Sequence, residues 1–588
     1  LAWYRSTGEN VMSKAKDLTT GKPISLMIKY AIPVLIGNLV QQIYNFADTI
    51  IVGQCLGNRT LAAVGNTGSM FFLVNGFVVG ITSGFSVHIA QCFGAKDYDR
   101  MRNSVCNAIM LWSGITLFIT LLSVLITKPV LRLINTPDGI FDMSYNYIVI
   151  IFAGIAAPML YNAVSCILRA LGDSKTPLYF LIFSALLNIG LDLLFIVVFK
   201  WGVAGAAIAT VLAQLVAGIA CIVYISVKFP ILHIKKEDFK INPGIIKTHL
   251  TIGLPMAFQF SVTAIGTIIL QGAVNVFGEN YIAAFTASSK TEQLIMQFGI
   301  SGGVTVANFV GQNVGAGRYD RIKNGILKWS LFTVGSAVLC MGVIFIFGRP
   351  ISRLFIKGGD ELILSYAMTY LHISMFFYIP LFQIFIFRNA LQAMGKTTMP
   401  LLAGFFELGA RSIVAYTLPK AIGFSGVCFA GPVAWVCAAV PLIITYIIYM
   451  KKFKKKGSFN TQFRGSLILR LFERRGSDMK DKDKHGFGTF GAIVLGVTAV
   501  ATAIVAVSKS KKKKQSLNSF LKDELVKLPL FSKNESHHAK KSAADEDDIF
   551  VDEDNEPQND KATSFYDEDI SYEEDEEFQS VSKAKPIV

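Results

Sequence analysis

The sequence predicts an all-α membrane protein in which twelve transmembrane helices form two six-helix lobes. Three observations support this fold class. The chain has 588 residues, 52% of them hydrophobic, and a mean hydropathy of +0.48, values typical of a protein that crosses the membrane many times. Twelve apolar runs are each long enough to span a bilayer as a helix, which takes roughly 20 residues. The first six runs and the last six share a repeated pattern.

The apolar runs follow one another with short polar connections, and in chain order they define the expected helices. They cover residues 28–52, 61–90, 105–127, 144–167, 177–199, 203–227, 250–277, 281–310, 325–348, 362–387, 399–419 and 425–450. We therefore expect an N-lobe at 28–227, an interlobe linker at 228–248 and a C-lobe at 249–450. Residues 1–27 are expected to be a cytoplasmic segment without the features of a signal peptide, and Met12 within them is a candidate start.

The repeat is clearest in the connection that follows the second run of each half. Residues 91–100 and 312–321 match at six of ten positions with an offset of 221, and Asn103 and Asn324 extend the match. Each repeat holds six spans, an even number, so both halves should have the same orientation. This predicts a pseudo-two-fold axis along the membrane normal, with substrate bound between the lobes.

The positions of the basic residues predict the orientation in the membrane. The connections on the side of the N-terminus carry about three times as many lysines and arginines as the connections on the other side. We therefore expect both ends of the twelve-helix core to be cytoplasmic in a multi-pass plasma-membrane protein. Because the basic residues lie in short loops, the net charge of +15 does not indicate nucleic-acid binding.

The fifth and sixth runs predict a polar group inside the membrane. Asp192 lies eight residues before the turn at Lys200-Trp201-Gly202, and Thr210 lies eight residues after it. Two antiparallel helices would place both side chains at one depth, roughly 12 Å from the turn. Asn188 is four residues before Asp192 and shares its helix face. Because an acid inside a bilayer is expensive unless it is paired or used, Asp192 is a candidate functional residue.

Other polar side chains in the apolar runs suggest further assignments. Glu407 and Arg411 are four residues apart, which favours a structural ion pair on one helix. Lys290 and Glu292 are two apart and do not face each other. The candidates for a substrate cavity at the lobe interface are Tyr44, Tyr161, Lys290, Glu292 and Met296.

The sequence carries none of the patterns of a cofactor-dependent enzyme. It has no phosphate-binding loop for ATP, and its eight cysteines fall in or beside apolar runs without metal-ligand spacing. No nucleophile–base spacing is present either. We therefore expect a protein that is not an enzyme, has no cofactor and carries no metal site built from these residue types.

Four motifs occur in the order found in the multidrug and toxic compound extrusion (MATE) family, which the chain resembles over about residues 25–450. They are the repeated Gln-x-x-Gly-Ala motif, residues 44–49, the loop 171–177, and the Gly-x-x-Gly-Ala-Ala sequence that begins at Gly202. The resemblance implies an antiporter for multidrug efflux that exports small organic, often cationic, compounds in exchange for H⁺ or Na⁺. It also implies a cation-binding site in the N-lobe, made by Asp48, Asn188, Asp192 and Thr210.

The chain departs from family branches that also use acids in spans 7 and 10, since Gln259, Gln271 and Gln383 are found there. A second cation site in the C-lobe is therefore disfavoured. The alternatives are a lipid-linked oligosaccharide flippase of the same superfamily and a non-transporting membrane scaffold. The expected partners are small organic substrates and the lipid bilayer, with the protein acting as a monomer.

The chain changes character after the twelfth run. Residues 451–486 form a basic linker, and 487–507 are a thirteenth apolar run that is a candidate transmembrane helix. Residues 508–588 are basic and then strongly acidic, a composition typical of disorder. Met479 and the lysines after it resemble the start of a separate small protein, so the tail is either a natural extension or a fused reading frame.

Overall fold

The computed structural model describes residues 15–134, 136–356 and 360–456. Ten helices in this part are long and apolar enough to cross a membrane, and two bent helix pairs add two more spans. The bent pairs are α6 (Asp138–Ala153) with α7 (Ala156–Ala170), at 44°, and α13 (Glu361–Met375) with α14 (Tyr378–Ala393), at 54°. The predicted twelve spans are thereby confirmed. Met12 and the chain from residue 457 onward, including the predicted thirteenth helix, lie outside the described residues.

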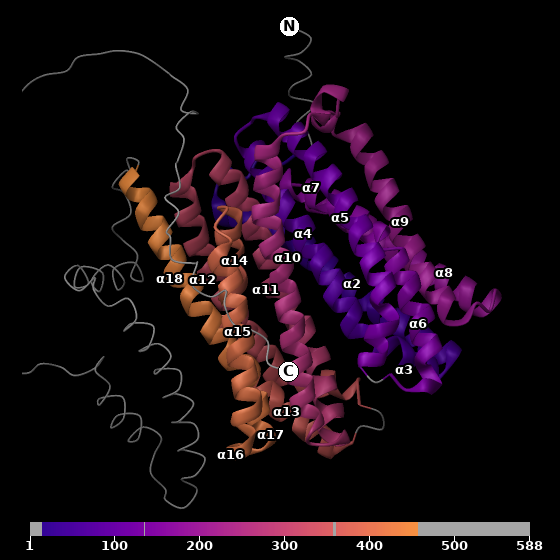
Figure 1. The fold of residues 1–588 in the computed structure, drawn as a ribbon. Helices are drawn as coiled ribbons and strands as arrows, with labels where there is room; N and C mark the ends of the chain where they lie inside the picture. Colours follow the sequence, from indigo (N-terminus) through magenta and orange to yellow (C-terminus); the bar gives the residue numbers. More distant parts are fainter. Residues whose placement is uncertain (1–14, 135, 357–359, 457–588) are drawn as a thin grey trace, which may run out of the picture. The chain divides into compact units, whose positions relative to one another are not determined.

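The N-lobe contains the first six spans, coloured indigo to purple in Figure 1. Besides α6 and α7 it comprises α2 (Pro23–Leu56), α3 (Asn58–Asn66), α4 (Gly68–Gly94), α5 (Tyr98–Leu133), α8 (Lys175–Asp192), the π-helix η1 (Leu193–Val198) and α9 (Gly202–Lys228). The interlobe linker follows α9 and contains two short 3₁₀ turns, η2 (Pro230–Leu232) and η3 (Lys236–Phe239).

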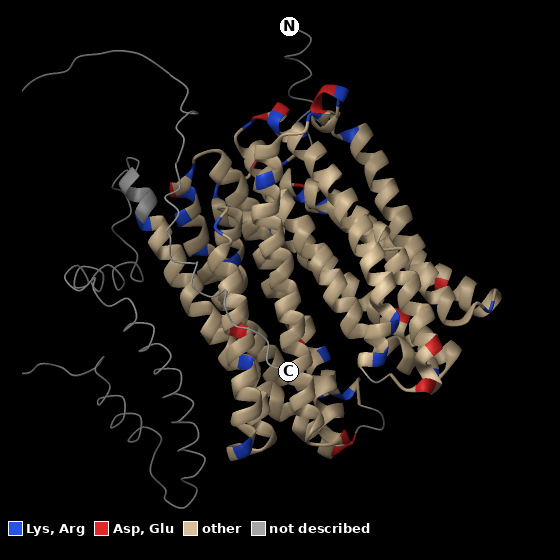
Figure 2. Ribbon diagram, in the orientation of Figure 1, with Lys and Arg blue, Asp and Glu red and all other residues tan. Residues whose placement is uncertain are grey.

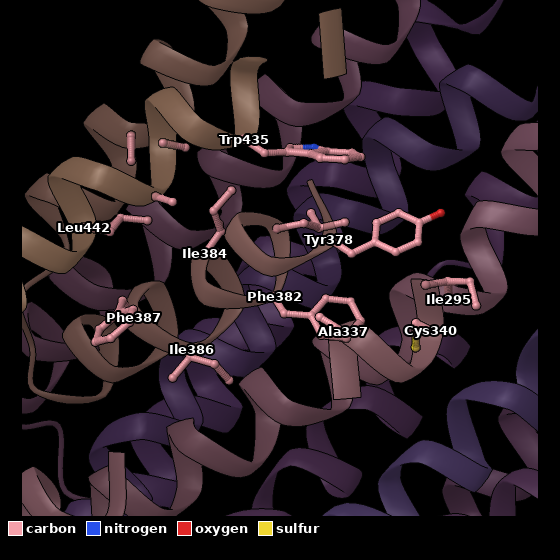
Figure 3. Close-up of a cluster of buried hydrophobic side chains, with 14 of the residues drawn as sticks. Ile295, Ala337, Cys340, Tyr378, Phe382, Ile384, Ile386, Phe387, Trp435 and Leu442 are labelled. Atoms are coloured by element: carbon pink, nitrogen blue, oxygen red, sulfur yellow. The ribbon is translucent and has the colours of Figure 1, made fainter. Parts of the chain in front are cut away.

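The C-lobe repeats this order. Besides α13 and α14 it comprises α10 (Pro243–Asn275), α11 (Glu279–Gly315), α12 (Tyr319–Arg353), α15 (Thr398–Thr417), α16 (Pro419–Ile422), α17 (Phe424–Cys428) and α18 (Ala430–Lys456). Figure 3 shows part of its core, in which side chains of α11, α12, α14 and α18 such as Phe382, Ala337 and Leu442 fill the space between the helices. Most of this buried cluster belongs to the C-lobe, and α2 of the N-lobe adds Met27, Tyr30 and Val34 to it.

The two lobes meet where the repeated motif ends α4 and α11. A Cβ atom on Gly94 would lie 1.9 Å from the carbonyl oxygen of Gln312, and one on Gly315 would lie 1.8 Å from that of Gln91. Each glycine of the motif thus packs directly on the backbone of the glutamine in the other copy. Any residue with a Cβ atom would clash there. The sequence repeat is explained by this symmetric backbone contact.

The two motif glutamines also cross between the lobes. The Gln91 side chain donates a 2.9 Å hydrogen bond to the carbonyl of Ala393 at the end of α14. The Gln312 side chain donates a 2.8 Å bond to the carbonyl of Ala170 at the end of α7, which is the equivalent helix. Most loops at this end of the helices carry Lys and Arg, at the top of Figure 2, and we call it the basic end.

The topology can be tested on the loops themselves. Cysteines placed at Lys96 and at Arg318, in a chain without Cys55, should both react with an impermeant maleimide from the cytoplasm, because both loops belong to the basic end. A cysteine at Lys200 is the matched control and should react only from outside. Labelling of Lys96→Cys and Arg318→Cys from opposite sides would contradict the parallel repeat.

Candidate functional site

Asp192 is the last residue of α8 and is followed at once by the π-helix η1. Its side chain is 0% exposed, and neither carboxyl oxygen has a hydrogen-bond partner among the described protein groups. A buried carboxyl group without a hydrogen-bond partner is costly inside a membrane, which makes Asp192 a candidate site residue.

Asp48 approaches Asp192 from α2, which packs along α8. Its Oδ1 atom is buried and also has no hydrogen-bond partner in the described structure. The two carboxyl groups are close enough to interact directly. Two carboxylates confined together repel unless they share a proton or a cation, so the pair can bind positive charge.

Asn188 of α8, one turn before Asp192, contacts Thr210 of α9. The Asn188 amide lies 3.5 Å from the Thr210 hydroxyl, which itself donates to the carbonyl of Ala206. The Oδ1 atom of Asn188 is buried without a partner. The contact between α8 and α9 follows from the turn at residues 199–201, where Lys200 has a positive φ of 56°. Carboxylate, amide and hydroxyl oxygens suit a hard cation.

Three further polar side chains surround the pair. Tyr44, one turn before Asp48 on α2, interacts with both acids and contacts Gln214 of α9. Tyr147 of α6 also interacts with both carboxyl groups. Sequence analysis missed Gln214 and Tyr147. Gln214 could have been found, because it lies four residues after Thr210 on the same helix face, whereas nothing in the sequence marks Tyr147.

The remaining substrate-cavity candidates have different surroundings. The ammonium group of Lys290 lies 5.7 Å from the centre of the Phe46 ring, so it faces α2. Glu292 is buried within the C-lobe, where one of its oxygens accepts a 2.9 Å hydrogen bond from Tyr370. Tyr161 donates to the carbonyl of Pro177 inside the N-lobe, and Met296 packs against the C-lobe core.

A charged cluster is buried in the C-lobe. Glu407 accepts from Arg411 at 2.8 Å and from Arg388 of α14 at 3.2 Å, and all three side chains are more than 90% buried. The predicted pair is thus part of a triad, because Arg388 reaches the same carboxylate from another helix. The cluster carries one more positive than negative charge, and Glu292 interacts electrostatically with Arg411.

The three glutamines in spans 7 and 10 have neutral partners. Gln259 accepts from Gln392 at 2.7 Å, Gln271 donates to Asn275 and Gln383 accepts from Ser330. Within the described ranges, no group of three or more His, Cys, Asp or Glu side chains could hold a metal ion.

Comparison with known proteins identifies relatives of the whole core. The family model described as MatE matches residues 33–194 and 255–417, one match in each lobe. The "Probable multidrug resistance protein YpnP" of Bacillus subtilis (strain 168) is 30% identical over 369 residues, covering 62% of this chain and 81% of the relative. "Probable multidrug resistance protein YoeA" of the same organism is 28% identical over 442 residues, covering 73% and 94%.

Solved structures share the fold. An outward-facing conformation of a multidrug resistance MATE family transporter superposes with a TM-score of 0.70 at 24% identity, covering 75% of this chain and 99% of that chain. A MOP superfamily transporter from Pyrococcus furiosus gives a TM-score of 0.71 at 23% identity, covering 76% and 98%.

Proposed function

Because this chain belongs to the MatE family of membrane transporters, we propose that it is a secondary antiporter that exports small organic, often cationic, compounds in exchange for H⁺ or Na⁺. The observation that carries the proposal is the pairing of Asp48 and Asp192, two acids brought together within the N-lobe. In this proposal the pair, with Asn188 and Thr210, binds the coupling cation in the plasma membrane.

Helix α2 is suited to transmit the state of this site to the other lobe. Asp48 faces α8, whereas Phe46, two residues away, contacts Lys290 and Phe355 of the C-lobe. Nearer the basic end, the Asn38 side chain donates a 3.0 Å hydrogen bond to Ser301 of α11. A cation that neutralises the acids changes how α2 packs on α8, and the contacts of α2 with the C-lobe respond.

Coupling then follows from differential affinity. A cation shifts the lobe arrangement only as far as it binds one arrangement more tightly than the other. The same linkage requires that substrate and cation alter each other's binding reciprocally. If the basic end is cytoplasmic, the contacts of Gly94 and Gly315 close the cytoplasmic side of the protein in this structure.

The charged side chains favour this function over the flippase alternative. A flippase for an anionic lipid-linked sugar would be expected to expose several basic groups between the lobes. Arg388 and Arg411 are instead buried against Glu407. Lys290, in contrast, faces Phe46 of the other lobe. The paired acids of the N-lobe have no evident use in a scaffold.

The proposal is tested by export from cells. Cells that express the protein should accumulate less of a fluorescent organic cation than cells without it, and the difference should vanish when the H⁺ and Na⁺ gradients are both collapsed. Collapsing each gradient separately identifies the ion. Accumulation that does not depend on either gradient would contradict an ion-coupled antiporter.

A further inference from the structure

Residues 16–21 precede α2 and lie across the junction of the two lobes at the basic end. On the N-lobe side, the backbone N–H of Lys16 donates a 2.9 Å hydrogen bond to the carbonyl of Leu171, in the loop between α7 and α8. The contact is close, because a Cβ atom on Gly172 would lie 2.1 Å from the carbonyl oxygen of Lys16. The segment is thus held on the N-lobe before α2 begins.

The same segment is held more extensively by the C-lobe. The N–H of Leu18 donates to the side-chain oxygen of Gln312 at 2.8 Å, and its carbonyl accepts from Asn313 at 3.2 Å. The guanidinium group of Arg321 donates to three carbonyls of the segment, those of Leu18, Thr20 and Gly21. The Leu18 side chain is only 1% exposed and belongs to the hydrophobic cluster of the C-lobe.

Gln312 joins three parts of the molecule. Its amide oxygen accepts from the N–H of Leu18, while its amide nitrogen donates to the carbonyl of Ala170 in the N-lobe. Asp17 keeps the segment in a turn, because its side chain accepts from both the N–H and the hydroxyl of Thr19. In this conformation the backbone groups of the segment bond to side chains of α11 and α12.

The interlobe linker makes the equivalent contact on the opposite lobe. Asn103 of α5 donates to the carbonyls of Asp238 and Lys240, just before the linker enters α10. In the repeat, α5 is equivalent to α12 and α10 to α2, so each lobe holds the segment that leads into the other lobe. The linker is covalently joined to both lobes. Residues 16–21 are tied to α12 by non-covalent contacts and can leave it.

We propose that residues 16–21 form a strap that holds the lobes together at the basic end and must detach from α11 and α12 when that end opens. The strap adds a conformational control that goes beyond the proposed export function and needs neither substrate nor coupling ion. Opening separates Leu171 from Gln312 and Arg321. Lys16 and Leu18, which bond to the two lobes, are only two residues apart, so their span of roughly 7 Å cannot bridge the widened gap. The strap therefore favours the closed basic end.

The test measures the distance between the lobes in the full chain. Spin labels at Lys175 and Lys396, both exposed at the basic end, report on the two lobes once Cys55 and Cys437, the two cysteines that are not buried, are replaced. Arg321→Gln removes the charged donors to the strap, and Leu18→Asp places a charge in the apolar cluster. Arg321→Gln should raise the ratio of long to short distances by roughly tenfold, as expected for the loss of a charged hydrogen bond. Leu18→Asp should raise the same ratio, because a carboxylate is costly in an apolar cluster.

Two controls separate the strap from general damage. Thr20→Ala keeps the backbone carbonyl that Arg321 uses, and Arg318→Gln removes a neighbouring exposed arginine whose ion partner is Asp320. Both should leave the distances unchanged. If Leu18→Asp fails to fold, the distances measured in Arg321→Gln are the test of the strap. Unchanged distances in a folded Arg321→Gln protein, or an equal shift in Arg318→Gln, would overturn the proposal.

Discussion

Asp192→Asn should reduce gradient-driven export to the level of cells that lack the protein, while insertion and surface expression stay normal. The amide keeps the shape of the side chain, but it can neither release a proton nor neutralise a sodium ion. Folding should tolerate the change, because a neutral amide costs less inside a membrane than a carboxylate. The measurement is export of a fluorescent organic cation under an imposed ion gradient, with expression matched between variants.

Further variants show whether the loss of export is specific to the proposed cation site. Asp48→Asn should behave like Asp192→Asn, and the double variant should be no worse, since groups that act as a unit are not additive. Thr210→Ala removes one oxygen ligand, worth about 1 kcal/mol or roughly a fivefold effect. A clear Thr210→Ala defect favours Na⁺, which prefers several oxygen ligands. Asp142→Asn, the same change at an exposed position, should export normally.

Glu407→Gln should lower the free energy of unfolding by about 3–5 kcal/mol, which is the cost of breaking a buried ion pair by removing one partner. Glu407 is the shared carboxylate of Arg388 and Arg411, and all three side chains are buried. Without it, two positive charges remain together in the C-lobe interior. The measurement is thermal unfolding of the detergent-solubilised protein.

A second substitution should relieve part of this loss. In Glu407→Gln/Arg411→Gln the cluster again carries one positive charge in excess, as in the unaltered chain, so the double variant should be more stable than Glu407→Gln alone. If Glu407→Gln instead unfolds at the temperature of the unaltered protein and fails only in export, the cluster belongs to transport and not to the stability of the C-lobe.

Most of the fold could be predicted because it depends on local signals. Apolar runs of sufficient length locate the spans, and the repeat of residues 91–100 at 312–321 gives the parallel arrangement of the lobes. The breaks between α6 and α7 and between α13 and α14 were not predicted. These runs are continuous in hydropathy, and the bend depends on how each helix packs in its lobe.

The candidate site was partly predictable for a similar reason. The contact of Asn188 with Thr210 follows from spacing about one turn, because simple helix geometry brings these two side chains together. The role of Asp48 came from the family resemblance, since its approach to Asp192 depends on packing between α2 and α8. Arg388, Tyr370 and the contact of Leu18 with Gln312 depend on pairs far apart in sequence, for which no local pattern exists.

The central claim is that Asp48 and Asp192 couple an ion gradient to export, and flux in proteoliposomes tests it most directly. The purified full chain is reconstituted, an organic cation is supplied on one side, and H⁺ and Na⁺ movements are recorded together with those of the substrate. We expect substrate movement to drive one of the two ions in the opposite direction, and Asp192→Asn to abolish this coupled flux. Substrate-driven ion flux of normal size in Asp192→Asn would contradict the claim.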